Sequence, residues 1–214
     1  MLNDKIVVVD YGMGNLHSVV KSLSRLGGEV LSSSDADIIL SASKLILPGV
    51  GHFAKAMENI QSLSLDAVLH QAVLENKIPV LGICLGMQLM SQYSEEGQQK
   101  GLGWFDANVV RFDFRSTDHL RIPHMGWNQL SFSDPHPMLI DVDLSDEFYF
   151  VHAYHWQCNN AAYTVANTNY SYPFASAVAR SHIWGVQFHP EKSRMGGEKI
   201  LRNFLFHRFE DVTE

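Results

Sequence analysis

Short aliphatic runs alternate with helix-like segments through the first 90 positions, and this alternation limits the fold more than any other feature of the sequence. Residues 6–9, Ile-Val-Val-Val, have the pattern of a strand buried on both faces. Apolar residues at 16, 19, 20, 23 and 26 follow with the spacing of one helix face. Segments 44–47 and 78–83 predict further strands, and 65–73 predicts a helix. Strands that alternate with helices indicate an α/β fold with a mostly parallel sheet, covered on both faces.

The pattern changes after about residue 104 to period-two segments separated by Gly, Pro, Asn and Asp. These segments, at 107–112, 148–154 and 183–188, are typical of antiparallel or edge strands. A last helix is expected over 197–209, with a frayed acidic end after it. We find no repeat, low-complexity tract or linker, and 214 residues suit one domain. The prediction is a single domain over 1–214, with a mixed sheet and a smaller antiparallel portion in the C-terminal half.

A cysteine stands between the strand at 78–83 and an apolar helix-like segment, with a glycine two positions before it and another two after it. This Gly-x-Cys-x-Gly pattern, centred on Cys84, is the cysteine form of a nucleophile elbow. A sharp strand-to-helix turn leaves no room for a Cβ atom, which explains the two glycines. Free N–H groups and the helix dipole at a helix start favour the thiolate. We interpret Cys84 as a nucleophile, with the Leu85 N–H facing a developing oxyanion.

Two simpler interpretations apply to the cysteines. Cys84 could be a buried apolar residue, which is the commonest role of a free cysteine. That interpretation does not explain the flanking glycines. Cys158 lies among Gln and Asn residues without such glycines, and we expect it to be an ordinary thiol.

A histidine and a glutamate near the C-terminus supply a candidate base and its orienting carboxylate. Over 183–191, large apolar residues at 184, 186 and 188 alternate with Gln187, His189 and Glu191. We expect these three polar residues on one face of a strand. Pro190 favours an extended conformation at His189. The carboxylate then fixes the imidazole tautomer, and the other ring nitrogen takes a proton from a thiol.

Two alternatives remain for this His-x-Glu pair, since the chain has eleven histidines. One is a structural surface pair. The other is a metal site, which needs a third ligand such as Cys84, whereas structural zinc sites take Cys and His at short paired spacings that this sequence lacks. We favour the nucleophile and base, with no metal ion and no cofactor.

Charge and apolar run length exclude several classes of protein. The net charge is -7 and Lys and Arg are scattered singly, which argues against a nucleic-acid partner. No apolar run approaches the ~20 residues of a membrane span, and the first run is too short for a signal peptide. We expect a cytoplasmic protein with two free thiols.

With Cys84 in its elbow and His189-Pro190-Glu191 downstream, the chain resembles the triad, or class I, glutamine amidotransferases. Further segments narrow the resemblance to the glutaminase subunits of the imidazole glycerol phosphate synthase family, in histidine biosynthesis. These segments are Asp10-Tyr11-Gly12-Met13-Gly14-Asn15, Leu47-Pro48-Gly49-Val50-Gly51-His52-Phe53, His124-Met125-Gly126-Trp127-Asn128 and Phe148-Tyr149-Phe150-Val151-His152-Ala153-Tyr154.

The resemblance implies a role for each matching residue. Cys84 would attack the carboxamide of L-glutamine, His189 would deliver the proton that expels ammonia, and Glu191 would hold His189. Gly51 and Leu85 would supply backbone donors to the oxyanion. The glutamine site would comprise Gly51, Gln88, His152, Ala153 and Tyr154.

The sequence departs from the family pattern at three positions. The family usually has Ser at Ala153, Tyr at His155 and a small residue at His52. These changes leave the three catalytic candidates intact, but they leave the acceptor open, because a paralogous pair of subunits aminates sugars for surface polysaccharide.

Ammonia released into neutral water becomes mostly ammonium, so a second protein must hold the acceptor site. The resemblance implies a (β/α)₈-barrel partner in a heterodimer, with ammonia passing through the barrel. Trp127, Tyr149, Tyr154 and Lys192 are our candidate contacts, since aromatic residues are enriched at interface centres. A core position for Trp127 is equally compatible with the sequence. We also expect glutaminase activity to be low in the isolated chain and to rise through Pro48 to Gly51 when the partner's acceptor site is loaded.

Two other functions share part of this pattern. Gly12-Met13-Gly14 follows the first strand, but the dinucleotide fingerprint needs a third glycine where His17 stands. A free-standing γ-glutamyl hydrolase shares the triad, but its activity would not depend on a second chain.

Overall fold

Five short parallel strands form the half of the sheet that carries the predicted nucleophile. In the computed structural model, which describes residues 5–114 and 120–209, β1 pairs with β2 and β3, and β3 pairs with β4. β13 then pairs in parallel with β4. Almost every residue of β1, β3, β4 and β13 is buried, as aliphatic runs without polar alternation predict.

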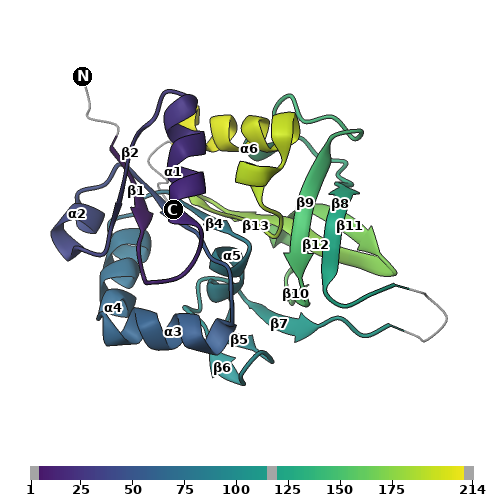
Figure 1. The fold of residues 1–214 in the computed structure, drawn as a ribbon, viewed down its shortest axis with the longest axis horizontal. Helices are drawn as coiled ribbons and strands as arrows, with labels where there is room; N and C mark the ends of the chain where they lie inside the picture. The colour runs from purple at the N-terminus through teal and green to yellow at the C-terminus, as the bar shows by residue number, and fades with distance from the viewer. Residues whose placement is uncertain (1–4, 115–119, 210–214) are drawn as a thin grey trace.

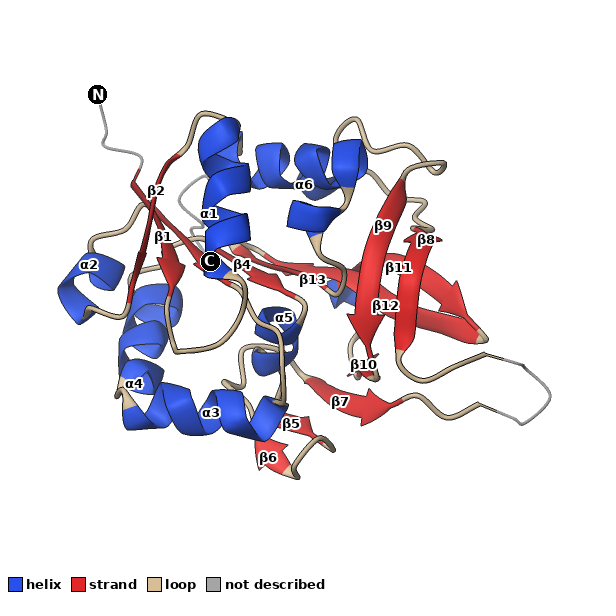
Figure 2. Ribbon diagram, viewed as in Figure 1, coloured by secondary structure: helices blue, strands red, loops and turns tan. Residues whose placement is uncertain are grey.

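The sheet continues beyond β13 with mostly antiparallel pairing. Within the described residues it has eleven strands in the order β2-β1-β3-β4-β13-β12-β10-β7-β5-β6, with β11 on β12, and β8 and β9 form a separate two-stranded sheet. The expected α/β fold with a mixed sheet is confirmed (Figure 2). The strands are β1 (Lys5–Val9), β2 (Glu29–Ser33), β3 (Lys44–Leu47), β4 (Val80–Ile83), β5 (Tyr93–Ser94), β6 (Gln99–Lys100), β7 (Ala107–Arg111), β8 (His124–Gln129), β9 (Glu147–His152), β10 (Tyr154–Cys158), β11 (Thr164–Tyr170), β12 (Tyr172–Arg180) and β13 (Ile183–Val186).

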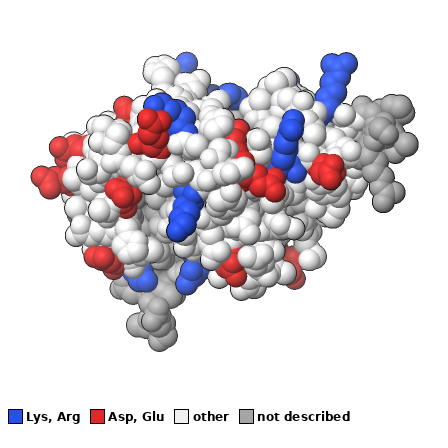
Figure 3. All heavy atoms as spheres, turned by 90° about the horizontal axis from the view of Figure 1, so that it is seen from below, with Lys and Arg blue, Asp and Glu red and all other residues white. Residues whose placement is uncertain are grey.

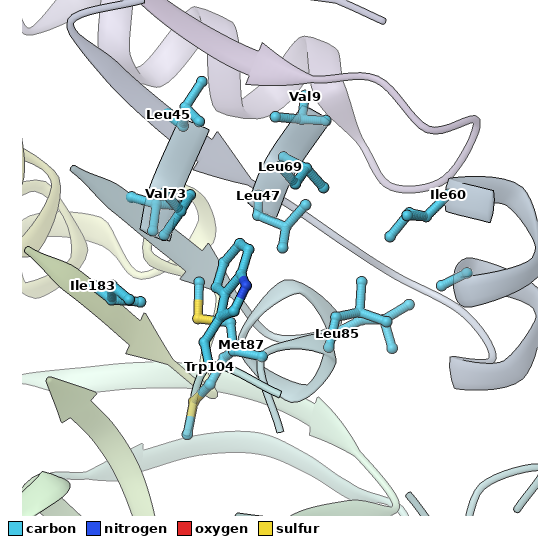
Figure 4. Packing of buried hydrophobic residues seen from close by; sticks show 14 of the residues in the cluster. Val9, Leu45, Leu47, Ile60, Leu69, Val73, Leu85, Met87, Trp104 and Ile183 are labelled. Atoms are coloured by element: carbon cyan, nitrogen blue, oxygen red, sulfur yellow. The ribbon is translucent and has the colours of Figure 1, made fainter. Parts of the chain in front are cut away.

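Helices cover both faces of this sheet, and alternate strand residues contribute to the two cores. One core joins the sheet to α2, α3, α4 and α5, and Figure 4 shows Trp104 beside Met87 within it. The other core joins the sheet to α1, α6 and β9, so that the two helices from opposite ends of the sequence lie side by side (Figure 1). The helices are α1 (Leu16–Arg25), α2 (Ala36–Leu40), α3 (Phe53–Ser62), α4 (Leu65–His70), α5 (Leu85–Leu89) and α6 (Arg194–Phe206).

Three predicted elements differ from the structure. Segment 183–188 is predicted to be antiparallel or at an edge; β13 does pair antiparallel with β12, but it also pairs in parallel with β4 and so lies inside the sheet. All four residues of β13 are buried, and the polar Gln187 that contributes to the sequence alternation lies beyond the end of the strand. Segment 148–154 is not one strand, since the chain leaves β9 at Ala153 and enters the other sheet as β10. The helix over 65–73 is α4 followed by a π-helical turn, Gln71–Glu75.

The last helix lies earlier than predicted, and several elements were not predicted at all. α6 begins at Arg194 and ends at Phe206, so residues 207–209 are not helical. α3 was missed although Phe53, Met57 and Ile60 recur on one buried face. β12 was missed because its alanine-rich sequence has little intrinsic preference for strands.

The surface carries charges of both signs without a dominant basic region on the face that Figure 3 shows. Lys and Arg side chains stand interspersed with Asp and Glu there. Among the helices that the structure describes, none is both long and apolar enough to cross a bilayer.

Lys44 at the start of β3 ties the sheet to the end of α6. Its Nζ atom donates to the carbonyl oxygens of Phe204, Leu205 and His207 at 3.0, 2.6 and 2.8 Å. These are carbonyls at a helix C-terminus, where intrahelical donors run out. A single half-buried ammonium therefore satisfies acceptors that would otherwise lose their partners.

We expect Lys44→Met to lower the free energy of unfolding by about 2 kcal/mol, because partly buried carbonyls lose a charged donor. Urea unfolding followed by circular dichroism measures this. Lys21→Met, on the exposed side of α1, is the matched control. Equal stability of the two variants would contradict the role assigned to Lys44.

Candidate active site

Cys84 lies at a tight turn between β4 and α5. Its backbone has φ +53° and ψ −107°, a strained conformation for a residue with a side chain. A Cβ on Gly86 would lie 1.7 Å from the Leu47 carbonyl oxygen, and one on Gly82 would lie 2.7 Å from the Met87 nitrogen. The two glycines are therefore required by close backbone approach, and the turn has the geometry expected of a nucleophile elbow.

The parallel pairing of β4 with β13 brings the histidine segment to the same edge of the sheet. Ile83 is in register with Val186, and the Cys84 N–H donates to the Val186 carbonyl at 2.8 Å. His189 follows three residues later in an extended conformation, as expected for a residue before proline. Its N–H donates to the Tyr149 carbonyl at 2.9 Å, which ties it to β9.

His189 and Glu191 form a buried pair. Nδ1 of the imidazole lies 2.9 Å from Oε1 of the carboxylate, and the side chains are 1% and 2% exposed. The surface-pair alternative is therefore wrong. The expectation that Glu191 shares a strand face with His189 is also wrong, because Glu191 lies in a 3₁₀ turn, Pro190–Lys192, that bends the chain back.

The electrostatic surroundings favour a charged imidazole. Burial alone would lower the pKa of His189, but contacts with Cys84 and Glu191 outweigh it and raise the pKa to about 10. Nδ1 faces Glu191, and Nε2 is buried without a partner of ordinary hydrogen-bond geometry among the described residues. Nε2 is thus the nitrogen that remains to exchange a proton.

A small cavity of about 60 Å³ adjoins Cys84. It gathers every residue predicted for the oxyanion and glutamine sites. Its lining is Val50, Gly51, Cys84, Leu85, Gln88, Glu96, Val151, His152, Ala153 and Tyr154. The cavity is smaller than the ~300 Å³ at which ordinary ligand pockets begin, so a bound ligand requires some widening.

Glu96 is a lining residue that sequence reasoning missed. Its Oε2 accepts the N–H of Phe53 at 2.8 Å, at the N-terminus of α3, where acidic groups are favoured. No motif surrounds it in the sequence, and only folding brings the loop after β5 to the cavity.

Gln88 presents only its carbonyl oxygen to a ligand. Its Nε2 donates to the Tyr154 carbonyl and to Oε1 of Gln187, both at 3.0 Å. Both amide hydrogens are therefore engaged, and the remaining Oε1 accepts hydrogen bonds.

The segment from Pro48 to Gly51, which contains one predicted oxyanion donor, is held by Tyr11 in the turn after β1. The Tyr11 hydroxyl donates to the Pro48 carbonyl. Burial, together with the negative charge of Cys84, raises the pKa of Tyr11, so the phenol stays protonated and able to donate. Gly51 has φ +128°, and Leu85 is the first residue of α5, where an N–H has no intrahelical acceptor. Both donors predicted for an oxyanion therefore border the cavity.

Two of the four candidate interface residues, Trp127 and Tyr149, lie on the two-stranded sheet. Trp127 is 41% exposed, so its core interpretation is wrong. Its ring packs edge-on against Tyr149 at 5.7 Å, and the Arg194 guanidinium stacks over it at 4.9 Å. Lys192 lies 5.8 Å from the Tyr149 ring centre, whereas Tyr154 lines the cavity instead.

Met125, which is not among the interface residues predicted from the sequence, projects from β8 beside Trp127. It is 63% exposed, and its period-two spacing from Trp127 places both side chains on the outward face of the strand.

The remaining residues singled out in the sequence lie outside this cavity. His155 is buried against Tyr172, whose hydroxyl is 3.0 Å from its Nε2, and His52 precedes α3. Cys158 is half-buried, and burial raises the pKa of its thiol. Across residues 5–114 and 120–209, no group of three or more His, Cys, Asp or Glu side chains is arranged to hold a metal ion.

Comparison with known proteins identifies similar chains. Residues 7–208 match the family profile described as glutamine amidotransferase class-I. Imidazole glycerol phosphate synthase subunit HisH 2 of Methanococcus maripaludis is 42% identical over 94% of this chain and 98% of its own length. Subunit HisH of Synechococcus elongatus is 45% identical over 94% and 92%.

Solved structures share the fold at low sequence identity. A crystal structure described as a glutamine amidotransferase superposes with a TM-score of 0.72 at 18% identity, covering 93% of this chain and 96% of that one. PurLQS from Thermotoga maritima gives 0.69 at 15%, covering 95% and 98%.

We expect the His189 ring to remain protonated through pH 8 in the intact chain and to titrate at lower pH in Cys84→Ala. The substitution removes one of the two contacts that oppose burial. Nuclear magnetic resonance of the histidine ring nitrogens measures the titration. Cys158→Ala is the control, and identical curves for Cys84→Ala and wild type would contradict the coupling.

Proposed function

Because the chain belongs to the class I glutamine amidotransferase family, we propose that it is the glutaminase subunit of an imidazole glycerol phosphate synthase, acting in histidine biosynthesis. The observation that carries the proposal is Cys84 at a strained elbow, next to a buried His189–Glu191 pair. Relatives named as HisH subunits of that synthase are aligned over 94% of the chain. The proposed unit is one amidotransferase domain spanning residues 1–214.

The proposed reaction is hydrolysis of L-glutamine to glutamate and ammonia. The Cys84 sulfur attacks the carboxamide carbon. The resulting oxyanion accepts hydrogen bonds from the backbone N–H groups of Gly51 and Leu85. His189 Nε2 gives its proton to the amide nitrogen, and the C–N bond breaks to release ammonia. The glutamyl group stays bound to the Cys84 sulfur as a thioester. A water molecule, deprotonated by His189, then hydrolyses the thioester.

Glu191 fixes which ring nitrogen reacts. By accepting from Nδ1 it leaves Nε2 as the nitrogen that exchanges a proton, and it stabilises the imidazolium. No step of this acyl transfer needs a metal ion or a cofactor.

Substrate recognition follows from the groups that line the cavity. Glu96 offers a carboxylate for the α-ammonium of glutamine, and Gln88 offers its one available amide oxygen. The backbone at His152, Ala153 and Tyr154 also lines the cavity and supplies further polar contacts.

The ammonia requires a partner, because free ammonia is protonated in neutral water. We propose a heterodimer with a (β/α)₈-barrel synthase subunit that docks on the face carrying Trp127, Tyr149 and Lys192. The aromatic pair of exposed Trp127 and half-buried Tyr149, each with a cation over its ring, supports it. A cytoplasmic location fits a biosynthetic subunit with two free thiols. Amination of a surface-polysaccharide sugar is the second candidate acceptor reaction, because the departures at Ala153 and His155 leave the acceptor open.

Partner binding also bears on activity. The cavity beside Cys84 is small, and the Pro48 to Gly51 segment forms part of its wall. We propose that loading of the partner's acceptor site reorients this segment and opens the site for glutamine.

We expect glutamate release from glutamine to be low in the isolated chain and to rise at least about 10-fold with the loaded barrel subunit. Cys84→Ala is expected to lose at least about 10³-fold in rate under both conditions, since it removes the nucleophile. A coupled glutamate assay measures this, with Cys158→Ala as the control. Full turnover by the isolated chain would end the activation hypothesis, and activity of Cys84→Ala would end the proposed function.

Trp127→Ala is expected to weaken binding of the barrel subunit by about 2 kcal/mol, because it removes an exposed aromatic residue from the interface centre. Titration calorimetry with the barrel subunit measures the affinity. Leu63→Ala, a similarly exposed apolar residue after α3, should bind as wild type. Equal affinity of both variants would place the interface elsewhere.

A further inference from the structure

Gln187 is a polar side chain whose burial the proposed reaction does not yet explain. It follows β13, lies two residues before His189 and is 0% exposed. Its Nε2 atom is 3.6 Å from the Cys84 sulfur, within hydrogen-bond range for a sulfur acceptor. A buried amide keeps its place only where its donors and acceptor are satisfied.

The orientation of this amide is fixed by a backbone carbonyl. The Tyr154 oxygen can only accept, so Gln88 must face it with its NH₂ group, at 3.0 Å. The other hydrogen of that group meets Gln187, which must therefore present its oxygen, also at 3.0 Å. The NH₂ group of Gln187 is thereby left to face Cys84.

An N–H directed at a sulfur stabilises the thiolate relative to the thiol. The helix dipole adds little at this turn, because α5 is only five residues long. We propose that Gln187 is a positioning residue that holds the Cys84 sulfur in its ionised form, with its own amide locked by Gln88. This inference rests on the proposed role of Cys84 as the nucleophile.

The proposal also gives Gln88 two functions. Its NH₂ group sets the orientation of Gln187, and its oxygen borders the cavity. A series of hydrogen bonds thus connects β10 with the nucleophile. It runs from the Tyr154 carbonyl through Gln88 and Gln187 to the Cys84 sulfur.

The test measures how fast iodoacetamide alkylates Cys84 as a function of pH in the full chain. Peptide mass spectrometry separates Cys84 from Cys158. Gln187→Met removes the donor, and Gln187→Glu keeps an acceptor for Gln88 while placing a carboxylate by the sulfur. We expect the midpoint of the alkylation profile to rise by roughly one to two pH units in Gln187→Met and further in Gln187→Glu.

Gln92→Glu, an exposed residue just beyond α5, is the matched control and should keep the wild-type midpoint. Circular dichroism identifies folded variants, and if Gln187→Met does not fold, Gln187→Glu decides alone. An unchanged midpoint in a folded variant overturns the proposal even if glutaminase activity falls, because packing alone would then account for the loss. Failure of the proposed function is a separate result, namely glutaminase activity that persists in Cys84→Ala.

Discussion

The parallel pairing of β4 with β13 is the constraint on which the site depends. It joins segments about 100 residues apart, with Ile83 in register with Val186. Because the two strands run in the same direction, both end at one edge of the sheet, and the turns that follow them meet there. Cys84 comes from one turn, and Gln187 and His189 come from the other. Loss of this register would separate the nucleophile from its base without changing either local motif.

Polar groups at this edge are buried, and their partners largely determine what they can do. The His189 imidazole is surrounded by groups that favour its charged form, and Glu191 fixes its tautomer. The Tyr154 carbonyl accepts from His152 Nδ1 at 2.7 Å as well as from Gln88. One oxygen that can only accept therefore fixes the direction of the hydrogen bonds from both His152 and Gln88. Such a network has few alternative arrangements, which favours a single geometry around the sulfur.

The same carbonyl connects the cavity to the exposed sheet. Since His152 donates through Nδ1, its Nε2 accepts from His124 Nδ1 at 3.2 Å. His124 belongs to β8, three residues before Trp127, and its ring stacks on Tyr170. Burial lowers the pKa of both histidines, so they remain neutral at neutral pH, as this directional chain requires. A chain of hydrogen bonds thus joins the two-stranded sheet proposed as the partner surface to the proposed glutamine site.

The sequence by itself determined the elbow, the candidate base and the alternating elements, because each depends on residues adjacent in the chain. The glycines around Cys84 and the proline after His189 have local steric consequences that hold in any fold. It did not determine that β13 is an interior strand, that Glu191 returns through a turn, or that Trp127 is exposed. Glu96 joins the cavity from a loop without a motif, and Gln187 acquires its direction from a carbonyl 33 residues away in the chain. These features depend on contacts between distant segments, and only the packed sheet decides which segments become neighbours.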